Sequence, residues 1–174
     1  MLILVTGGSR SGKSNFALET ARRFEGPRLF LATAQASDEE MRRRIDAHRK
    51  SRPADWSVVE ESREVPRALR AALGPGSAGV VIVDCLTMWV SNLILEDESF
   101  GETEAAAVAG ELAAAARGTA SGVIVVTNEV GSGVVPDNAL ARRFRDCAGR
   151  ANQVLAREAA EVHLCVSGIA IAIK

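Results

Sequence analysis

Short runs of apolar residues alternate with segments of helical character along the chain. Most of these runs are nearly continuously apolar and rich in Val, Ile and Leu, which is typical of strands that are covered on both faces. The expected strands span 2–6, 28–33, 56–60, 79–84, 122–127, 162–167 and 169–173. The expected helices span 13–24, 37–51, 65–73, 86–95, 104–117 and 138–159. This order predicts an α/β fold, a three-layer sandwich whose mostly parallel sheet carries helices on both faces.

Local features refine this prediction. The last two expected strands are joined at Gly168, which predicts an antiparallel hairpin at the C-terminal edge of the sheet. Ser37 stands three residues before Glu40, as in a capping box, and predicts the start of the second helix. The richest turn segment, 74–77, is too short to separate domains, and 174 residues is a usual length for one domain. We therefore expect a single domain over residues 1–174.

Charge and cysteine content argue against several classes of protein. Lys and Arg number 21 against 22 Asp and Glu, so the chain lacks the positive charge of a typical nucleic-acid binder. Its apolar runs are much shorter than the roughly 18 residues of a membrane span. Cys85, Cys147 and Cys165 form no CxxC pair and are odd in number, which favours free thiols in a reducing compartment. We expect a cytoplasmic protein with neither a nucleic-acid partner nor a membrane span.

One segment fits the phosphate-loop pattern G-x-x-x-x-G-K-[ST]: Gly7-Gly8-Ser9-Arg10-Ser11-Gly12-Lys13-Ser14. Its glycines permit a tight loop whose backbone N–H groups can surround phosphate oxygens. Lys13 would place its charge on the β- and γ-phosphates, and the N-terminus of the following helix favours an anion. A chance match in a Gly/Ser-rich turn is the alternative, but the expected strand–loop–helix context argues against it. The segment therefore predicts a P-loop NTPase-like fold.

The apolar strand that ends in Asp84 is the expected companion of this loop. Asp84 would hold Mg²⁺ directly or through water, and the Ser14 hydroxyl would supply another oxygen ligand. An ordinary helix cap or loop carboxylate is the alternative for Asp84. Together the loop and the carboxylate predict a site for Mg²⁺ and a nucleoside triphosphate beyond the carboxyl ends of the strands.

His48 shares one face of an expected helix with Met41 and Ile45, because the spacing is i, i+4, i+7. A histidine at the margin of the core, with one hydrogen bond satisfied, is the simpler interpretation. A neutral imidazole can also attack phosphorus, which would make His48 a covalent catalyst. Positive residues follow it closely, although the C-terminus of a helix favours such charges in any case. His163 lies inside an apolar run and is interpreted as structural.

The polar pair Asn128 and Glu129 follows another expected strand at the same edge of the sheet. It would position substrate or nucleotide, or else form only a polar turn. Candidate phosphate contacts among the arginines are Arg10, Arg142, Arg145 and Arg150. The sequence does not identify the general base of a phosphoryl transfer.

Several segments form a combination that is more specific than the phosphate loop alone. They span 6–14, 32–34, 44–49, 52–56, 127–136, 144–153 and 166–169. In this order, and over essentially the whole chain, they resemble the bifunctional adenosylcobinamide kinase / adenosylcobinamide-phosphate guanylyltransferase family of cobalamin biosynthesis. Ala170 stands where many family members carry a proline, a difference that concerns the last strand.

The resemblance implies two reactions. One phosphorylates the hydroxyl of the aminopropanol arm of adenosylcobinamide with ATP or GTP. The other transfers GMP from GTP to that phosphate, through a guanylylated histidine, and releases pyrophosphate. His48 is similar in its motif position to that histidine, with Lys13 as a further catalytic residue. The resemblance also implies a homo-oligomer, namely a trimer.

The resemblance implies a set of GTP contacts as well. The set comprises Gly7, Gly8, Ser9, Arg10, Ser11, Gly12, Lys13, Ser14, Ala32, Thr33, Ala34, Arg49, Lys50, Ser51, Arg52, Glu60 and Asp84. Glu61 adjoins Glu60 and is the alternative to it. Two competing functions are a phosphate-loop kinase of another small metabolite without a covalent step, and a nucleotide-switch module that acts on a partner. His48 distinguishes the bifunctional enzyme from the simple kinase, because only the former needs a histidine nucleophile.

Overall fold

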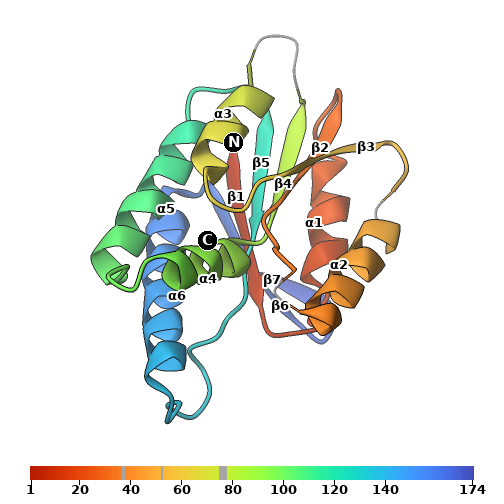
Figure 1. Cartoon of the computed structure of the whole chain (residues 1–174). Coiled ribbons are helices and arrows are strands. Elements are labelled where there is room, and N and C mark those ends of the chain that lie inside the picture. Colours follow the sequence, from red (N-terminus) through yellow and green to blue (C-terminus); the bar gives the residue numbers. More distant parts are fainter. Residues whose placement is uncertain (37, 52, 75–77) are drawn as a thin grey trace.

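A computed structural model describes residues 1–36, 38–51, 53–74 and 78–174, with the backbone alone at residues 44, 48, 50 and 51. A seven-stranded sheet runs through the middle in the order β3-β2-β4-β5-β1-β6-β7 (Figure 1). The strands are β1 (Leu2–Gly7), β2 (Arg28–Ala32), β3 (Trp56–Glu60), β4 (Val80–Asp84), β5 (Gly122–Val126), β6 (Glu161–Val166) and β7 (Ile169–Ala172). The helices are α1 (Lys13–Ala21), α2 (Glu39–Ser51), α3 (Val65–Ala72), α4 (Leu86–Glu96), α5 (Glu102–Ala116) and α6 (Ala139–Glu158). All neighbouring strands pair in parallel except β6 and β7, which confirms the mostly parallel sheet and its edge hairpin.

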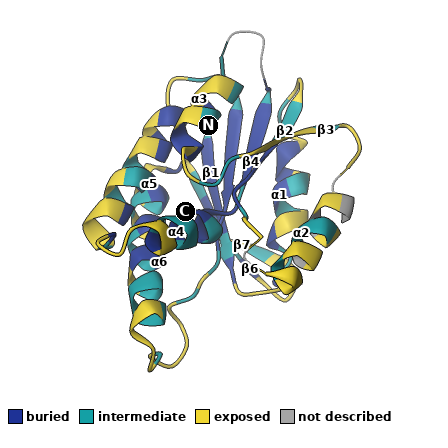
Figure 2. Cartoon of the chain, in the orientation of Figure 1, coloured by how far each residue is buried: buried dark blue, intermediate teal, exposed yellow. Residues whose placement is uncertain are grey.

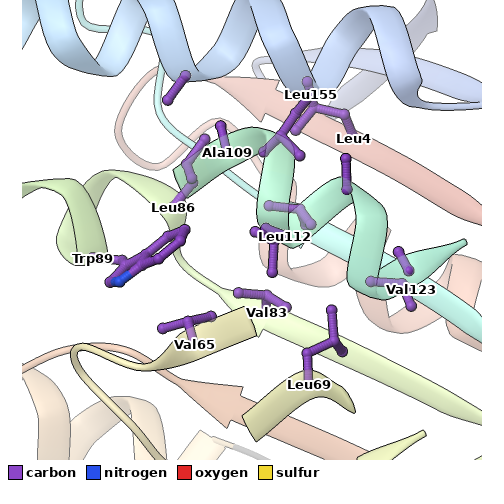
Figure 3. Packing of buried hydrophobic residues seen from close by; sticks show 14 of the residues in the cluster. Leu4, Val65, Leu69, Val83, Leu86, Trp89, Ala109, Leu112, Val123 and Leu155 are labelled. Atoms are coloured by element: carbon purple, nitrogen blue, oxygen red, sulfur yellow. The ribbon is translucent and has the colours of Figure 1, made fainter. Parts of the chain in front are cut away.

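One face of the sheet carries α3, α4, α5 and α6. Leu4 and Val83 of the sheet belong to a buried cluster with Leu112 of α5 and Leu155 of α6 (Figure 3). Trp89 of α4 joins this cluster and is 1% exposed. Burying one large apolar side chain stabilises a fold by roughly 1.5–3 kcal/mol, so this cluster contributes substantially to stability.

The opposite face carries α1. Ile3 and Val5 of β1 and Ile82 of β4 form a second buried cluster with Ala17 and Ala21 of α1. The small alanine side chains let α1 lie close to the sheet directly after the phosphate-loop segment. The expected helices on both faces are therefore confirmed.

The structure differs from the sequence prediction at the end of α1. The expected helix runs to residue 24, whereas α1 ends at Ala21. The ring of Phe24 lies over Gly122, where an added Cβ would come within 2.6 Å of a ring carbon. Phe24 thus leaves the helical path to cover the start of β5, and this packing overrides its helical propensity.

A second difference concerns β3. The apolar pattern predicts a strand covered on both faces, but β3 is an edge strand whose Val58 and Val59 are 44% and 40% exposed. Figure 2 shows β3 and α2 as largely exposed, in contrast with the buried central strands.

At the start of α2, Asp38 Oδ1 accepts a hydrogen bond of 2.7 Å from Met41 N, whereas Ser37 of the expected capping box lies outside the described residues. Among the helices of the described ranges, none has the length and hydropathy required to cross a membrane.

Candidate functional site

The carboxyl ends of four neighbouring parallel strands lie level with one another. Ala32 at the end of β2 pairs with Asp84 of β4, and Asp84 pairs with Val126 of β5. Val126 in turn pairs with Val5, two residues before β1 ends in the phosphate loop. The residues that follow these strands therefore meet at one edge of the sheet, where ligands bind in open α/β folds.

The phosphate-loop segment follows a path that needs glycine at two positions. Gly7 has a φ of 149°, and a Cβ there would lie 2.3 Å from the Cys165 carbonyl oxygen of the neighbouring strand β6. Gly12, which precedes α1, has a φ of 96°, and its Cβ would lie 3.0 Å from Gly168 Cα. Because any side chain would clash or be strained at these positions, the loop backbone is fixed by close contact with β6 and its hairpin.

Lys13 is the buried cation of this loop. Its side chain is 8% exposed, and its Nζ donates a hydrogen bond of 2.6 Å to the Gly8 carbonyl oxygen. Burial lowers the pKa of Lys13, while electrostatic interactions with Cys85, Cys165 and Asp84 oppose that shift. A buried ammonium group at the N-terminus of α1 is suited to an anionic ligand that can replace the Gly8 carbonyl as its partner.

Asp84 is half-buried and is held in place by the end of β2. Its carbonyl oxygen accepts a hydrogen bond of 3.1 Å from Thr33 N. The fully buried Thr33 hydroxyl accepts from Cys85 N at 2.9 Å and donates to Cys85 O at 2.7 Å. Thr33 O accepts a further hydrogen bond of 2.7 Å from Asn92. All polar atoms of Thr33 are thus engaged within the fold, and Thr33 fixes the backbone that carries Asp84.

The metal donors expected from the sequence are Asp84 and Ser14. Ser14 is exposed in the first turn of α1, and Asp84 is close enough to Lys13 to affect its pKa. Within the described part of the chain, no three His, Cys, Asp or Glu residues gather as a metal site. Mg²⁺ is usually held by one or two protein oxygens together with substrate phosphates and water, so this donor pair fits that ion and not an all-protein cage.

A pocket of about 390 Å³ opens between α2 and the ends of β2 and β3. Its lining residues are Ala32, Ala34, Gln35, Ala36, Arg42, Ile45, Asp46, Arg49, Glu60, Glu61 and Ser62. The structure therefore brings together Ala32, Ala34, Arg49 and Glu60, and both Glu60 and its alternative Glu61 face the same space. Gln35 follows an expected strand at this edge of the sheet, as the sequence indicates, whereas Ser62 was not predicted. The helical spacing of Arg42, Ile45, Asp46 and Arg49 was a usable signal for the α2 side of the pocket.

An ion pair forms one wall of this pocket. Arg49 donates to Glu60 Oε1 at 2.6 and 2.9 Å, and it also contacts Asp46 at 3.3 Å. The hydrogen bond with Glu60 raises the pKa of Arg49. Both side chains are about half exposed, at 48% and 53%, so the pair is solvated and exchangeable. A second pocket, of about 270 Å³, lies against the same pair beside Trp56.

The remaining expected contacts are only partly described. His48, Lys50 and Ser51 lie in the C-terminal half of α2, but their side chains are outside the described residues, as is the whole of Arg52. Among the candidate arginines, Arg142 donates to Pro136 O, and Arg145 pairs with the adjacent Asp146. Arg150 donates to Gln153 in the same helix, and Arg10 lies in the phosphate loop with a φ of 55°. His163 Nε2 donates a hydrogen bond of 3.0 Å to the Glu161 carboxylate, which agrees with its structural interpretation.

The sheet and the loop define an α/β protein with a P-loop-like fold. The family model described as cobinamide kinase / cobinamide phosphate guanyltransferase matches residues 3–173. The chain belongs to this family, as the sequence resemblance predicts, and is therefore an enzyme with a kinase and a guanylyltransferase class of activity.

Known relatives match this chain over nearly its full length. The chain is 43% identical to the bifunctional adenosylcobalamin biosynthesis protein CobU of Escherichia coli (strain K12), and all of both chains is covered. It is 44% identical to the protein of the same name from Salmonella typhimurium, also over all of both chains. The bifunctional adenosylcobalamin biosynthesis protein CobP of Pseudomonas aeruginosa is 40% identical, with 98% of this chain and 96% of the relative covered.

Proposed function

We propose that this chain phosphorylates adenosylcobinamide at its aminopropanol hydroxyl and then transfers GMP from GTP to the new phosphate through His48. The observation that carries the proposal is the position of Lys13, Asp84 and the pocket of Glu60 at one edge of one sheet. A single nucleotide site in one domain, residues 1–174, would then serve both steps. The sequence resemblance supplies the corrinoid substrate and the role of His48.

The phosphate half of the proposed site is the loop from Gly7 to Ser14. The backbone N–H groups of Gly8, Ser9 and Arg10 and of the first residues of α1 would face phosphate oxygens. Lys13 would exchange the Gly8 carbonyl for the β- and γ-phosphates and offset their charge. The same charge stabilises a diphosphate leaving group in phosphorylation and pyrophosphate in GMP transfer, which is why one loop suffices for both reactions.

Mg²⁺ fits the proposed site on the chemistry of its donors. Asp84 and Ser14 would hold the ion together with phosphate oxygens, and Thr33 would keep Asp84 in place. When bound, the ion withdraws charge from the phosphates of the nucleotide. Replacing Lys13 or Asp84 should therefore lower the rates of both reactions.

The base half of the proposed site is the pocket between α2 and β3. The Glu60 carboxylate would accept hydrogen bonds from the ring N–H and the amino group of guanine, which adenine cannot offer in that arrangement. Ala32 and Ala34 leave room for the base beside the end of β2. To bind the base, Glu60 would give up its ion pair with Arg49. This exchange costs little free energy because the ion pair is solvated.

In each of the two transfers, every bond that forms is matched by a bond that breaks. In phosphorylation, the substrate oxygen bonds to the γ-phosphorus, and the bond from that phosphorus to the β,γ-bridging oxygen breaks. In GMP transfer, a neutral nitrogen of His48 attacks the α-phosphorus and pyrophosphate leaves. The phosphate of the second substrate then attacks the same phosphorus, the P–N bond breaks, and His48 is restored.

The direct test follows the corrinoid through both steps. Purified protein is incubated with adenosylcobinamide, Mg²⁺ and ATP, and the products are separated by chromatography before and after GTP is added. We expect adenosylcobinamide phosphate first and adenosylcobinamide-GDP after GTP. Phosphorylation of another small hydroxyl compound, with adenosylcobinamide left unchanged, would contradict the proposal. Light scattering in the same buffer tests the further proposal that the enzyme is a homotrimer.

A further inference from the structure

The strand β5 lies between the two strands that carry the phosphate-binding residues. In the sheet order, β5 has β1 on one side and β4 on the other. Val126, its last residue, pairs with Val5 and with Asp84. The chain that leaves β5 therefore emerges between the phosphate loop and the proposed metal ligand, where the γ-phosphate of a nucleotide would lie.

Glu129 is the carboxylate that this segment brings to the loop. Its backbone N donates a hydrogen bond of 3.1 Å to the carbonyl oxygen of Gly7, the first residue of the loop. Its side chain is exposed, and its Oε1 accepts a hydrogen bond of 2.8 Å from Gly131 N. With respect to the described residues, Oε2 has no hydrogen bond or ion pair. One carboxylate oxygen is thus anchored and the other is available.

Polar contacts with α4 and α6 hold Thr127 and Asn128, the two residues directly before Glu129. Asn128 Nδ2 donates to Thr87 Oγ1 in the first turn of α4 at 2.7 Å. Asn152 of α6 donates to Asn128 O at 3.3 Å and accepts from the Thr127 hydroxyl at 2.7 Å. The segment is therefore attached to two helices and to the phosphate loop, which is what a precisely placed reacting group needs. These contacts also assign Asn128 a role in holding the segment.

Other carboxylates at this edge are less well placed to meet a substrate hydroxyl. Asp84 is the proposed metal ligand, and Glu60 and Glu61 follow β3. Because β3 is four strand spacings from β1, those two lie on the order of 19 Å to the side of the phosphate loop. Glu129 follows the strand directly next to β1, one spacing of about 4.8 Å away.

We infer that Glu129 is the general base of the phosphorylation step, an inference that rests on the proposed function. Its Oε2 accepts the proton of the substrate hydroxyl as that oxygen bonds to the γ-phosphorus. The electron pair of the breaking P–O bond goes to the leaving nucleoside diphosphate, whose charge Lys13 offsets. Glu129 then returns the proton to solvent. GMP transfer needs no such base, because a neutral imidazole and then a phosphate oxygen are the nucleophiles.

The test compares the two reactions in the full-length enzyme. In Glu129→Gln, the amide oxygen can still accept from Gly131 N, but the side chain no longer takes up a proton. We expect the rate of phosphorylation to fall about 100-fold. GMP transfer to supplied adenosylcobinamide phosphate should stay within about twofold of wild type. Glu111→Gln, an exposed glutamate of α5, is the matched control and should leave both rates unchanged.

A second variant moves the carboxylate without removing it. A Cβ at Gly131 would lie 3.0 Å from Glu129 Oε1, so Gly131→Ala should displace the carboxylate and slow phosphorylation alone, by about tenfold. Full phosphorylation by Glu129→Gln would overturn the inference and leave the proposed function intact. An equal loss of both reactions would overturn it too, because it would indicate a purely structural role. Wild-type enzyme that does not phosphorylate adenosylcobinamide would instead overturn the proposed function.

Discussion

The two halves of the proposed nucleotide site are built in different ways. Around the phosphate loop, Lys13 is 8% exposed, and Gly7 lies so close to β6 that a Cβ would be 2.3 Å from a backbone oxygen. Around the pocket, Arg49 of α2 and Glu60 at the end of the edge strand β3 are about half exposed and form an ion pair. The first half is continuous with the core of the protein, whereas the second is a surface wall closed by a solvated ion pair.

The two halves should therefore differ in how they bind a nucleotide: the loop is preformed, and the α2 wall adapts. The loop conformation is set by packing between β1, β6 and the start of α1, so it is present before a nucleotide arrives. The α2 wall is held by polar contacts that are worth little in water, so it can change partners when a base enters. Changes in the loop should therefore affect stability and both reactions, and changes in the wall should affect the choice of nucleotide.

The largest expected effect follows the loss of the buried cation. Lys13→Ala should slow both phosphorylation and GMP transfer by at least about 100-fold, because both leaving groups lose the same charge. Rates are measured with saturating nucleotide for each step separately. Lys174→Ala, which removes an ammonium bonded to carbonyls of α6, is the control. If only one of the two rates falls, the two reactions do not share the loop.

The next effect concerns the fixed backbone of the loop. Gly7→Ala should lower the free energy of unfolding by about 2–4 kcal/mol, because the methyl group would overlap a carbonyl of β6 and the φ is unfavourable. Gly8→Ala is a close control, since a Cβ there meets nothing within 4 Å. Chemical denaturation of both variants measures the difference. Equal stability of the Gly7→Ala and Gly8→Ala variants would show that Gly7 is not tightly packed against β6.

A smaller effect is expected in the wall of the pocket. Glu60→Gln should reduce the preference for GTP over ATP about tenfold in nucleotide binding, since an amide cannot accept both guanine N–H groups. The melting temperature should hardly change, because Glu60 is half exposed. Calorimetric titration with each nucleotide gives the ratio of affinities. Glu61→Gln serves as the comparison, and a larger loss there would assign the base to Glu61.

The smallest effect concerns the ion pair between Arg23, just after the end of α1, and Glu161 of β6. Hydrogen bonds from Arg23 and then His163 lower the pKa of Glu161 to about 2. Since the pKa is depressed in the folded state, the pair stabilises the protein above pH 4.5, and this stabilisation is lost as the pH falls toward 2.

Because the side chains of Arg23 and Glu161 are 50% and 26% exposed, the contribution is about 1 kcal/mol after solvent screening. Denaturation of Glu161→Gln and wild type should differ by that amount at pH 7 and converge near pH 2. Glu19→Gln breaks a more exposed pair, between Glu19 of α1 and Arg22, and should show no such pH dependence. A constant difference at all pH values would contradict the assignment to charge.

The contrast also explains what could be predicted from the sequence. The central strands follow from continuous apolar runs, and the phosphate loop follows from glycine and lysine spacing, because both are local patterns. The end of α1 could not be predicted, since Phe24 is drawn to Gly122 by tertiary packing. The exposure of β3 depends on the order of strands in the sheet. Likewise, Glu129 could not be chosen as a base until β5 was known to lie between β1 and β4.

We propose that GMP passes through His48 on α2 while the phosphate loop serves both reactions, and labelling of the enzyme tests this most directly. Wild-type and His48→Ala protein are incubated with Mg²⁺ and GTP labelled at the α-phosphate, denatured, and assayed for bound label. We expect an acid-labile, alkali-stable label on the wild type and none on His48→Ala, whose phosphorylation of adenosylcobinamide with ATP is retained. Label that persists in His48→Ala, or wild-type protein that transfers GMP without ever becoming labelled, would contradict the account.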